Sequence, residues 1–208
     1  MESIIKCARR LKDSEIKKLV NSRITEFKNT GKQTGDEIFN ELCFCILTAN
    51  FQAERGIKIQ KEIGNGFLTL TESQLSKKLK ELGHRYPNTR AKFIVEARKH
   101  RNSLKETIKS FGSEENAREW LVKNVKGLGY KEASHFLRNI GFENLAIIDF
   151  HIIDILAKHK LIERPKTLTK RKYLEIEELL KKIAKKLGMN LAELDLYLWC
   201  AETGKVLK

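Results

Sequence analysis

The sequence lacks the cysteine spacing that marks a metal centre. Its four cysteines are Cys7, Cys43, Cys45 and Cys200, and no two of them form the CxxC pair of a zinc site or an iron–sulfur cluster. Cys43 and Cys45 lie inside an apolar run, so we expect them to be reduced side chains of the core. The sequence therefore predicts a protein that works without a bound metal.

Long apolar runs and strand patterns are missing as well. No segment approaches the roughly 20 unbroken apolar residues that a bilayer-spanning helix needs. The N-terminal stretch MESIIKCARRLKDSE has neither the apolar core nor the cleavage site of a secretory signal. Sustained alternation of apolar and polar residues, internal repeats and low-complexity tracts are also absent. We therefore expect an intracellular protein with no membrane partner.

Acidic residues are outnumbered by basic ones. The chain has 27 Asp and Glu against 41 Lys and Arg, which gives a net charge of +14. Such an excess favours a polyanionic partner, because each contact between a cation and a phosphate releases a counterion. A solvated, lysine-rich surface of the kind found in heat-adapted proteins explains the same excess. Charge alone does not decide between the two.

Apolar residues at helical spacing fill almost the whole chain, which predicts an all-α fold. The 208 residues suit one globular unit, or two small lobes that share a cleft. Thr71, Ser113 and Asn190 are expected to cap helix starts. The expected helices cover about 13–27, 36–49, 71–83, 90–98, 113–125 and 190–199.

The most polar connection, residues 163–172, is a candidate boundary between lobes. We treat 1–208 as a single unit with a central cleft, and expect segments 1–35 and 165–208 to form the second lobe.

The sequence KGLGYK, residues 126–131, predicts a sharp turn between two helices that together cover about 115–141. Gly127 and Gly129 permit positive φ and close approach of a ligand, and Leu128 is expected to anchor the turn in the core. Free N–H groups at the start of the second helix suit a phosphate oxygen. These features predict a helix-hairpin-helix that grips the DNA backbone through residues 127–129. An ordinary tight turn between helices also uses glycine.

Lys131 and Asp149 are the candidate catalytic pair. Lys131 falls in the first turn of the second helix, where the helix dipole opposes a positive charge and so favours the neutral, nucleophilic amine. A neutral lysine can form a Schiff base with C1′ of a sugar. Asp149 stands in the apolar run IIDFHII, where a carboxylate is costly to bury without a task. It is expected to cap the next helix and, from there, to stabilise positive charge on the sugar.

The hairpin GLGYK followed by IDFHI resembles the helix-hairpin-helix, Gly/Pro-Asp superfamily of DNA glycosylases. The resemblance covers about residues 36–160, with ELCFCILTAN (41–50) similar to an early helix and turn. It implies an enzyme that flips a damaged base out of duplex DNA, cleaves its glycosidic bond through an imine on Lys131, and breaks the strand by β-elimination. The alternative is a non-catalytic DNA-binding hairpin in which Lys131 contacts a phosphate. That alternative gives the carboxylate of Asp149 no role.

Among the branches of this superfamily, the chain resembles the compact archaeal-type 8-oxoguanine DNA glycosylases in its size and in the segments RAKFIVEAR (90–98) and LDLYLWCAETGKVLK (194–208). Endonuclease III-like enzymes, which act on oxidised pyrimidines, usually add a four-cysteine cluster that is missing here, and human-type 8-oxoguanine glycosylases add a β domain. The same chemistry on oxidised pyrimidines remains the alternative. The resemblance implies that Lys208 and its carboxylate recognise the flipped base, although a frayed terminus is the usual state of last residues.

Four further residues are candidates for contacts with duplex DNA. Trp199 is expected either to stack on the flipped base or to pack in the core. Asn50 is a candidate to fill the gap left by the base, Arg85 to contact the orphaned cytosine, and His151 to bind phosphate. The resemblance implies these roles for Asn50 and Arg85; the alternatives for the three residues are a helix C-cap, a solvated charge and an exposed helix histidine.

The expected partner is double-stranded DNA with a damaged base, bound by a monomer in the cytoplasm or at the nucleoid. No cofactor is expected, and a monovalent cation at the carbonyls of the hairpin stays open.

Overall fold

Helices form the whole architecture, and no strand is present in the computed structural model, which describes residues 1–208. The predicted all-α class is thereby confirmed. The α-helices are α1 (Glu2–Lys12), α2 (Ile16–Thr30), α3 (Gly35–Thr48), α4 (Ala53–Ile63), α5 (Gly66–Thr69), α6 (Glu72–Glu81), α7 (Pro87–Ala97), α8 (Leu104–Ser110), α9 (Glu114–Asn124), α10 (Tyr130–Asn139), α11 (Phe150–Lys158), α12 (Lys170–Leu187) and α13 (Leu191–Thr203), with a short 3-10 turn at Arg98–His100.

The helix starts follow the side-chain caps that the sequence predicts. The Thr71 hydroxyl accepts from the Gln74 N–H at 3.3 Å, and the Gln74 side chain accepts from the Thr71 N–H at 3.0 Å, which completes a capping box at α6. Ser113 caps α9 and Asn190 caps α13 in the expected positions. None of the helices combines the length and the apolar character that a bilayer crossing demands.

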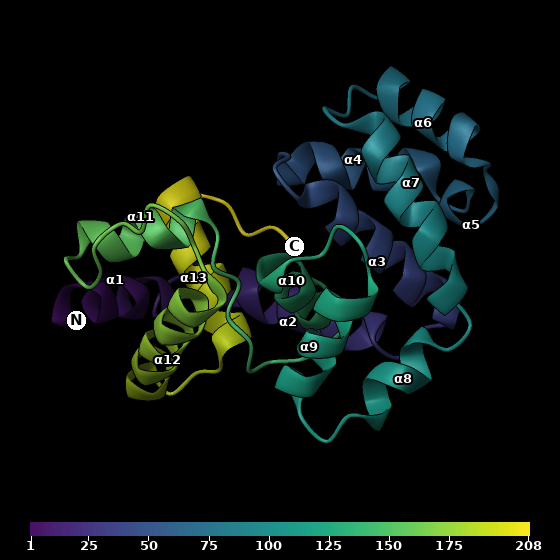
Figure 1. Ribbon diagram of the computed structural model, residues 1–208. Coiled ribbons are helices and arrows are strands. Elements are labelled where there is room, and N and C mark those ends of the chain that lie inside the picture. Colours follow the sequence, from purple (N-terminus) through teal and green to yellow (C-terminus); the bar gives the residue numbers. More distant parts are fainter.

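Two hydrophobic cores divide the molecule into two lobes (Figure 1). The larger core is built by α3–α10, which we call the central lobe. The smaller core joins α1 with α11, α12 and α13, which we call the terminal lobe; the purple N-terminal helix therefore lies beside the yellow C-terminal one. Burying the apolar stripe of each helix against the others of its lobe is the main source of stability for both.

Helix α2 links the lobes. Its buried Val20 and Phe27 pack with Leu196 and Tyr197 of α13. At its end, Gly31 comes so close to the last turn of α10 that a Cβ there would lie 2.0 Å from the carbonyl oxygen of Ile140. Only glycine permits this approach, so α2 is fixed against both the terminal helix and the helix of the hairpin.

The chain passes between lobes at residues 145–146, not at 163–172 as the sequence led us to expect. Leu145 is buried in the central core, whereas Ala146, Ile148 and Ile152 are buried in the terminal core. Segment 163–172 lies inside the terminal lobe, where it connects α11 to α12 and forms the first residues of α12. Its polar composition reflects exposure to solvent. The sequence did not mark residues 145–146 as the crossing between lobes because they are apolar. The terminal lobe therefore includes residues 146–164 as well as α1 and the segment from 165 to the end of α13, whereas α2, within the expected segment 1–35, links the two lobes.

Candidate active site

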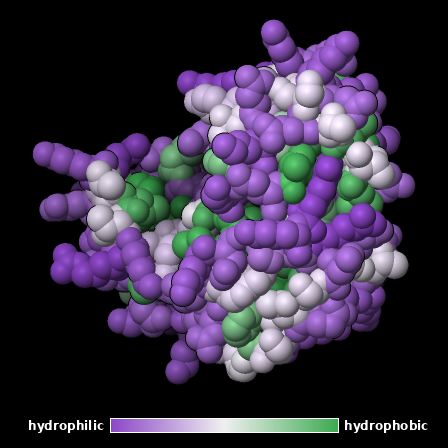
Figure 2. Space-filling view, turned by 45° about the vertical axis from the view of Figure 1, so that its right-hand side comes forward, coloured by the Kyte–Doolittle hydropathy of each residue, from purple (hydrophilic) through white to green (hydrophobic).

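A cleft of about 780 Å³ opens between the two lobes and collects most of the residues that the sequence singled out. A volume of this order is typical of sites for small ligands, including a single nucleobase. On the side of the molecule seen in Figure 2 the surface is mostly hydrophilic, and hydrophobic side chains gather where it is hollowed between the smaller left-hand part and the larger body. The predicted residues that line the cleft are Asn50, Arg85, Lys131, Asp149, His151, Trp199 and Lys208.

The hairpin has the geometry that its glycines predict. Helix α9 ends at Asn124, α10 begins at Tyr130, and Gly127 between them has a φ of +88°. A Cβ on Gly127 would lie 2.5 Å from the ring of Phe93, so this position requires glycine for space as well as for conformation. Leu128 is buried in the central core, as expected for the anchor of the turn. Residues 127–129 do not line the cleft, and Gly129 is exposed two residues before Lys131.

Glu132 was not among the residues found from the sequence, although it touches two of them. One of its oxygens accepts from the Gly129 N–H at 3.2 Å, which caps α10, and the other lies 3.1 Å from Nζ of Lys131. The spacing of Gly129 and Glu132, three residues apart at a helix start, was the signal that could have revealed this contact. In the free protein the lysine is therefore ion-paired at the wall of the cleft, with 25% of its side chain exposed.

Asp149 is the N-cap of α11, as predicted. Its Oδ1 accepts from the Ile152 N–H at 3.0 Å, and its other oxygen has no hydrogen-bond partner within the protein. Because the cap fixes one oxygen, the carboxylate is oriented before any ligand arrives. Lys131 and Asp149 thus reach the same cleft from opposite lobes, one at the start of α10 and the other at the start of α11.

A buried ion pair also lines the cleft and was not foreseen from the sequence. Nη1 of Arg138 is 2.6 Å from Oδ2 of Asp195, and both side chains are buried. Burial raises the pKa of Asp195 to about 6; Arg138 opposes this change, and the negative charge of Asp149 adds to it. The two carboxyl groups therefore sense each other at one end of the cleft.

His135 lies one turn beyond Lys131 on α10 and faces the cleft. Its ring meets the ring of Phe44 edge-on at 5.7 Å, and its Nε2 has no hydrogen-bond partner. Burial lowers the pKa of His135 well below its usual value, and the charges of Arg138, Lys131 and Lys208 act in the same direction. The imidazole is therefore neutral at physiological pH.

The C-terminal residue is held in place rather than frayed. Beyond α13 the chain crosses to the central lobe and ends between the lobes (Figure 1). Nζ of Lys208 lies 2.8 Å from Oε2 of Glu41 and 2.6 Å from Oε1 of Gln60, and it sits 4.4 Å above the ring of Phe44. The sequence predicted Lys208 in the pocket but not these partners, because they come from α3 and α4.

The remaining predicted residues frame the mouth of the cleft. Trp199 is half-buried, and its ring meets that of His151 edge-on at 5.8 Å. Asn50 directly follows the C-cap of α3 in the left-handed conformation, with a φ of +57°. The guanidinium of Arg85 lies over the ring of Tyr86, 5.1 Å away. Phe150, which the sequence analysis did not mark, is 64% exposed beside Asp149.

A metal site is not evident in this arrangement. No group of three or more His, Cys, Asp or Glu side chains is placed to hold a metal ion. All four cysteines are free, and burial raises the pKa of the Cys43 and Cys45 thiols well above their usual range. As predicted, both of these cysteines are reduced members of the central core.

An all-helical fold of two lobes, with a helix-hairpin-helix at the edge of the cleft and a lysine and an aspartate facing across it, defines the class of the helix-hairpin-helix DNA glycosylases. A family profile described as 8-oxoguanine DNA glycosylase matches residues 20–189. The chain belongs to this 8-oxoguanine DNA glycosylase family.

Named relatives match over their whole length. The protein named 8-oxoguanine DNA glycosylase/AP lyase in Korarchaeum cryptofilum is 54% identical over 209 residues, which cover 100% of this chain and 99% of the relative. A solved structure of the Methanocaldococcus jannaschii 8-oxoguanine glycosylase/lyase, in complex with a 15mer DNA that contains 8-oxoguanine, is 55% identical. It superimposes with a TM-score of 0.97 over 99% of this chain and 100% of its own. The 8-oxoguanine DNA glycosylase of Thermotoga maritima is 49% identical, with a TM-score of 0.94 over 100% of this chain and 99% of its own.

Proposed function

We propose that this protein removes 8-oxoguanine from duplex DNA and then cleaves the strand at the resulting abasic site. The observation that carries the proposal is the placement of Lys131 and Asp149 at two helix starts on opposite sides of one cleft. Membership of the 8-oxoguanine DNA glycosylase family supports the lesion, and the close structural relative bound to 8-oxoguanine DNA supports the duplex as substrate.

DNA binding starts at the hairpin. The turn at residues 127–129 and the start of α10 meet a phosphate of the damaged strand, and the net charge of +14 attracts the duplex. His151 contacts a second phosphate. Asn50 enters the space that the flipped base leaves, and Arg85 offers donors to the orphaned cytosine.

The flipped base enters the cleft between Trp199 and the end of the chain. The indole provides a face on which a purine can stack. 8-Oxoguanine differs from guanine in having an N–H at position 7, and the carboxylate of Lys208 can accept a hydrogen bond from it. Glu41 and Gln60 hold the ammonium group of Lys208 and so restrict the position of its carboxylate. Recognition of a single N–H requires such a restricted acceptor.

Catalysis begins at the amine of Lys131. The helix dipole at the start of α10 opposes its positive charge, and loss of one proton gives the nucleophile. The amine attacks C1′ of the sugar, the glycosidic bond breaks and the base leaves with the bonding electrons. Asp149 stabilises the positive charge that develops on the sugar. The C1′–O4′ bond of the resulting aminal then breaks as O4′ takes up a proton, which gives the imine. The imine loses a proton from C2′, and β-elimination expels the 3′ phosphate.

The proposed steps need no metal or organic cofactor, and a single chain supplies every group named. We therefore expect the protein to act as a monomer on intracellular, nucleoid DNA. The monovalent cation at the hairpin carbonyls stays a prediction.

Borohydride trapping on a duplex with 8-oxoguanine tests the proposal, because reduction of the imine leaves a stable covalent complex. We expect the wild type to be trapped and Lys131→Gln to give no complex. Lys126→Gln is the matched control, because Lys126 lies in the same hairpin but pairs with Glu96 outside the cleft. Trapping of Lys131→Gln at the wild-type level would exclude Lys131 as the nucleophile, and absence of trapping in the wild type would leave a non-catalytic DNA-binding module.

The lesion is tested by a panel of duplexes that carry either 8-oxoguanine or an oxidised pyrimidine. We expect excision of the purine lesion at a clearly higher rate. The opposite preference would assign the chain to the chemistry of oxidised pyrimidines.

A further inference from the structure

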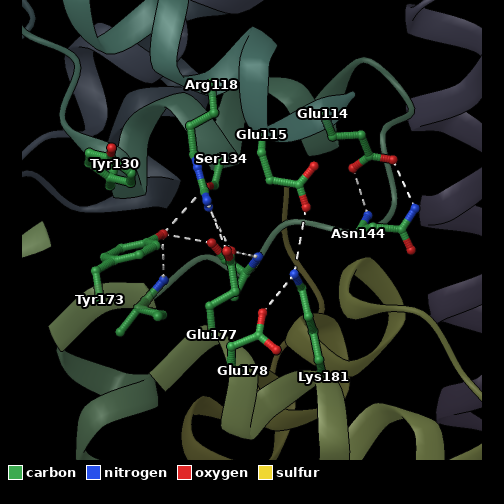
Figure 3. Close-up of polar contacts among 12 residues, drawn as sticks. Glu114, Glu115, Arg118, Tyr130, Ser134, Asn144, Tyr173, Glu177, Glu178 and Lys181 are labelled. Carbon is green, nitrogen blue, oxygen red and sulfur yellow. Dashed lines mark hydrogen bonds and ion pairs between the residues drawn. The ribbon is translucent and has the colours of Figure 1, made fainter. Parts of the chain in front are cut away.

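A buried polar network connects the two lobes (Figure 3). Arg118 of α9 and Glu177 of α12 form a two-pronged ion pair, with Nη1 to Oε2 at 2.6 Å and Nη2 to Oε1 at 2.8 Å. Their side chains are only 1% and 2% exposed. The hydroxyl of Tyr173, also on α12, lies in the same network.

The network supplies the backbone hydrogen bonds of the segment that leads to Asp149. This segment is not helical, so its N–H and C=O groups have no partner of the regular kind. Oε2 of Glu177 accepts from the Ala146 N–H at 2.8 Å. The Tyr173 hydroxyl donates to the Ala146 carbonyl at 2.6 Å and accepts from the Ile148 N–H at 3.3 Å. Two side chains of α12 thus fix the backbone up to the residue before Asp149.

The other end of the network reaches the helix that carries Lys131. Oγ of Ser134 lies 3.2 Å from Nη1 of Arg118 and 3.4 Å from the Tyr173 hydroxyl. The guanidinium of Arg118 also stacks over the ring of Tyr130 at 5.1 Å, and the rings of Tyr130 and Tyr173 are 5.4 Å apart. Tyr130 is the neighbour of Lys131 in the chain, and Ser134 lies about one turn further along α10.

Holding two lobes together does not by itself require these charges. Burying an ion pair costs several kcal/mol of desolvation, and apolar side chains of similar volume often stabilise a contact as well or better. What apolar side chains cannot provide is a set of directional bonds to the carbonyl and amide groups of one segment. The network is therefore suited to fixing the position of that segment relative to α10.

We infer that Arg118, Glu177 and Tyr173 are positioning residues that set the placement of Asp149 relative to Lys131. This inference rests on the proposed function of the pair. None of the three touches the cleft, so each acts only through the backbone of residues 146–148 and through α10. A displacement of the order of 1 Å between reacting groups costs up to about 100-fold in rate, which makes such a device valuable.

Tyr173→Phe is the informative variant, because it keeps the ring packing and the ion pair but removes the hydroxyl that bonds Ala146 and Ile148. We expect the single-turnover rate of 8-oxoguanine excision to fall roughly 10- to 100-fold. Affinity for the lesion duplex is expected to change by less than about twofold, because no DNA contact is lost. Tyr197→Phe is the matched control, since the Tyr197 ring is buried against Val20 and Phe27 of α2 and its hydroxyl has no bond to this segment, so the variant should keep the wild-type rate.

A double-mutant cycle with Asp149→Asn decides whether Tyr173 acts through Asp149. In the Asp149→Asn background, Tyr173→Phe should slow the residual excision by less than about twofold, because the group that it positions is already disabled. Ser134→Ala should show the same dependence on Asp149.

Three outcomes separate the hypotheses. A wild-type rate for Tyr173→Phe, or an equal loss in both backgrounds, would overturn the inference while leaving the proposed function intact. A wild-type rate for Asp149→Asn would overturn the proposed role of Asp149, and the inference with it. Poor folding would lower the active fraction in both backgrounds equally and would therefore count against the inference.

Discussion

The two ends of the cleft are built in different ways. At the reaction end, Lys131 and Asp149 each lie at a helix start, and glycine conformations, a side-chain cap and the bonds to residues 146–148 set their positions. At the recognition end, Lys208 is placed by side chains from two other helices, Glu41 and Gln60. The first end depends on local helix starts together with the α12 side chains that bond residues 146–148, and the second depends on side-chain contacts alone.

The difference separates the groups proposed to carry out the reaction from the group proposed to select the base. Imine formation needs a nucleophile and a carboxylate at a fixed distance, and helix termini are rigid supports for both. Discrimination between 8-oxoguanine and guanine depends on a single N–H, so it can be carried by one anchored terminal group. We therefore expect the two ends to fail independently, and the following predictions test that expectation.

Asp149→Asn is expected to have the largest effect, at the reaction end. Loss of the charge that stabilises the sugar cation should slow excision by about 100- to 1000-fold, whereas the amide can still cap α11. Single-turnover excision and a filter-binding isotherm measure the two quantities. Loss of binding in parallel with rate would instead assign Asp149 to holding DNA.

Gly127→Ala should damage the support of the reaction end. An alanine at a φ of +88°, with its Cβ directed into the Phe93 ring, should lower the free energy of unfolding by about 1–3 kcal/mol and weaken DNA binding. Gly112→Ala, where the new Cβ meets nothing within 4 Å, should stay within about 0.5 kcal/mol of wild type. Chemical denaturation provides the comparison, and equal effects of the two variants would contradict the strain argument.

The recognition end can be altered without touching the reaction end. Lys208→Met removes the anchored ammonium but keeps a terminal carboxylate, whereas adding one glycine after Lys208 keeps the anchor but displaces the carboxylate. Each should reduce the preference for 8-oxoguanine over guanine by about tenfold. Cleavage of a duplex with a preformed abasic site should be unchanged in both, because no base is read. A loss of that lyase activity would show that the two ends are not independent.

The smallest expected effect concerns stability, at Asp195. Its pKa is about 6 in the folded protein and 3.8 in its ordinary state, so the folded chain binds the proton more tightly. Its contribution to stability is therefore complete below the ordinary pKa and is lost as the pH rises through about 6. Relative to Asp195→Asn, the wild type should lose stability as the pH rises from about 4 to about 6.

Denaturation of both proteins across that pH range is the measurement, and groups common to the two cancel in the difference. Asp149→Asn should move the window to lower pH, because the charge of Asp149 raises the pKa of Asp195. A difference that does not depend on pH would contradict the assignment.

Local features of the sequence predicted the helices and the reaction end. The caps at Thr71, Ser113 and Asn190, the turn at Gly127 and the cap at Asp149 depend on residues no more than three positions apart, and all were found where expected. The resemblance to a known superfamily then joined Lys131 to Asp149.

The features that escaped prediction depend on pairs that are distant in sequence. The partner of Arg118 is 59 residues away, that of Arg138 is 57 away and that of Lys208 is 167 away. No periodicity or local composition marks such pairs, because a buried charge looks like an exposed one until the helices are packed. The lobe boundary was misplaced for a related reason: the chain crosses between the lobes within an apolar run that each lobe buries in its own core.

The terminal lobe has its first helix at one end of the chain and its other three at the opposite end. Ile4 and Ala8 of α1 are completely buried, against partners that begin at Ala146. During synthesis the apolar side of α1 therefore stays without its partners until α11–α13 have been made. The central lobe is continuous in sequence, and its helices are made earlier. The cleft is completed in the last step, so no unfinished chain carries both Lys131 and Asp149 in place. A chain that ends before α11 therefore carries Lys131 without Asp149 and lacks one wall of the cleft.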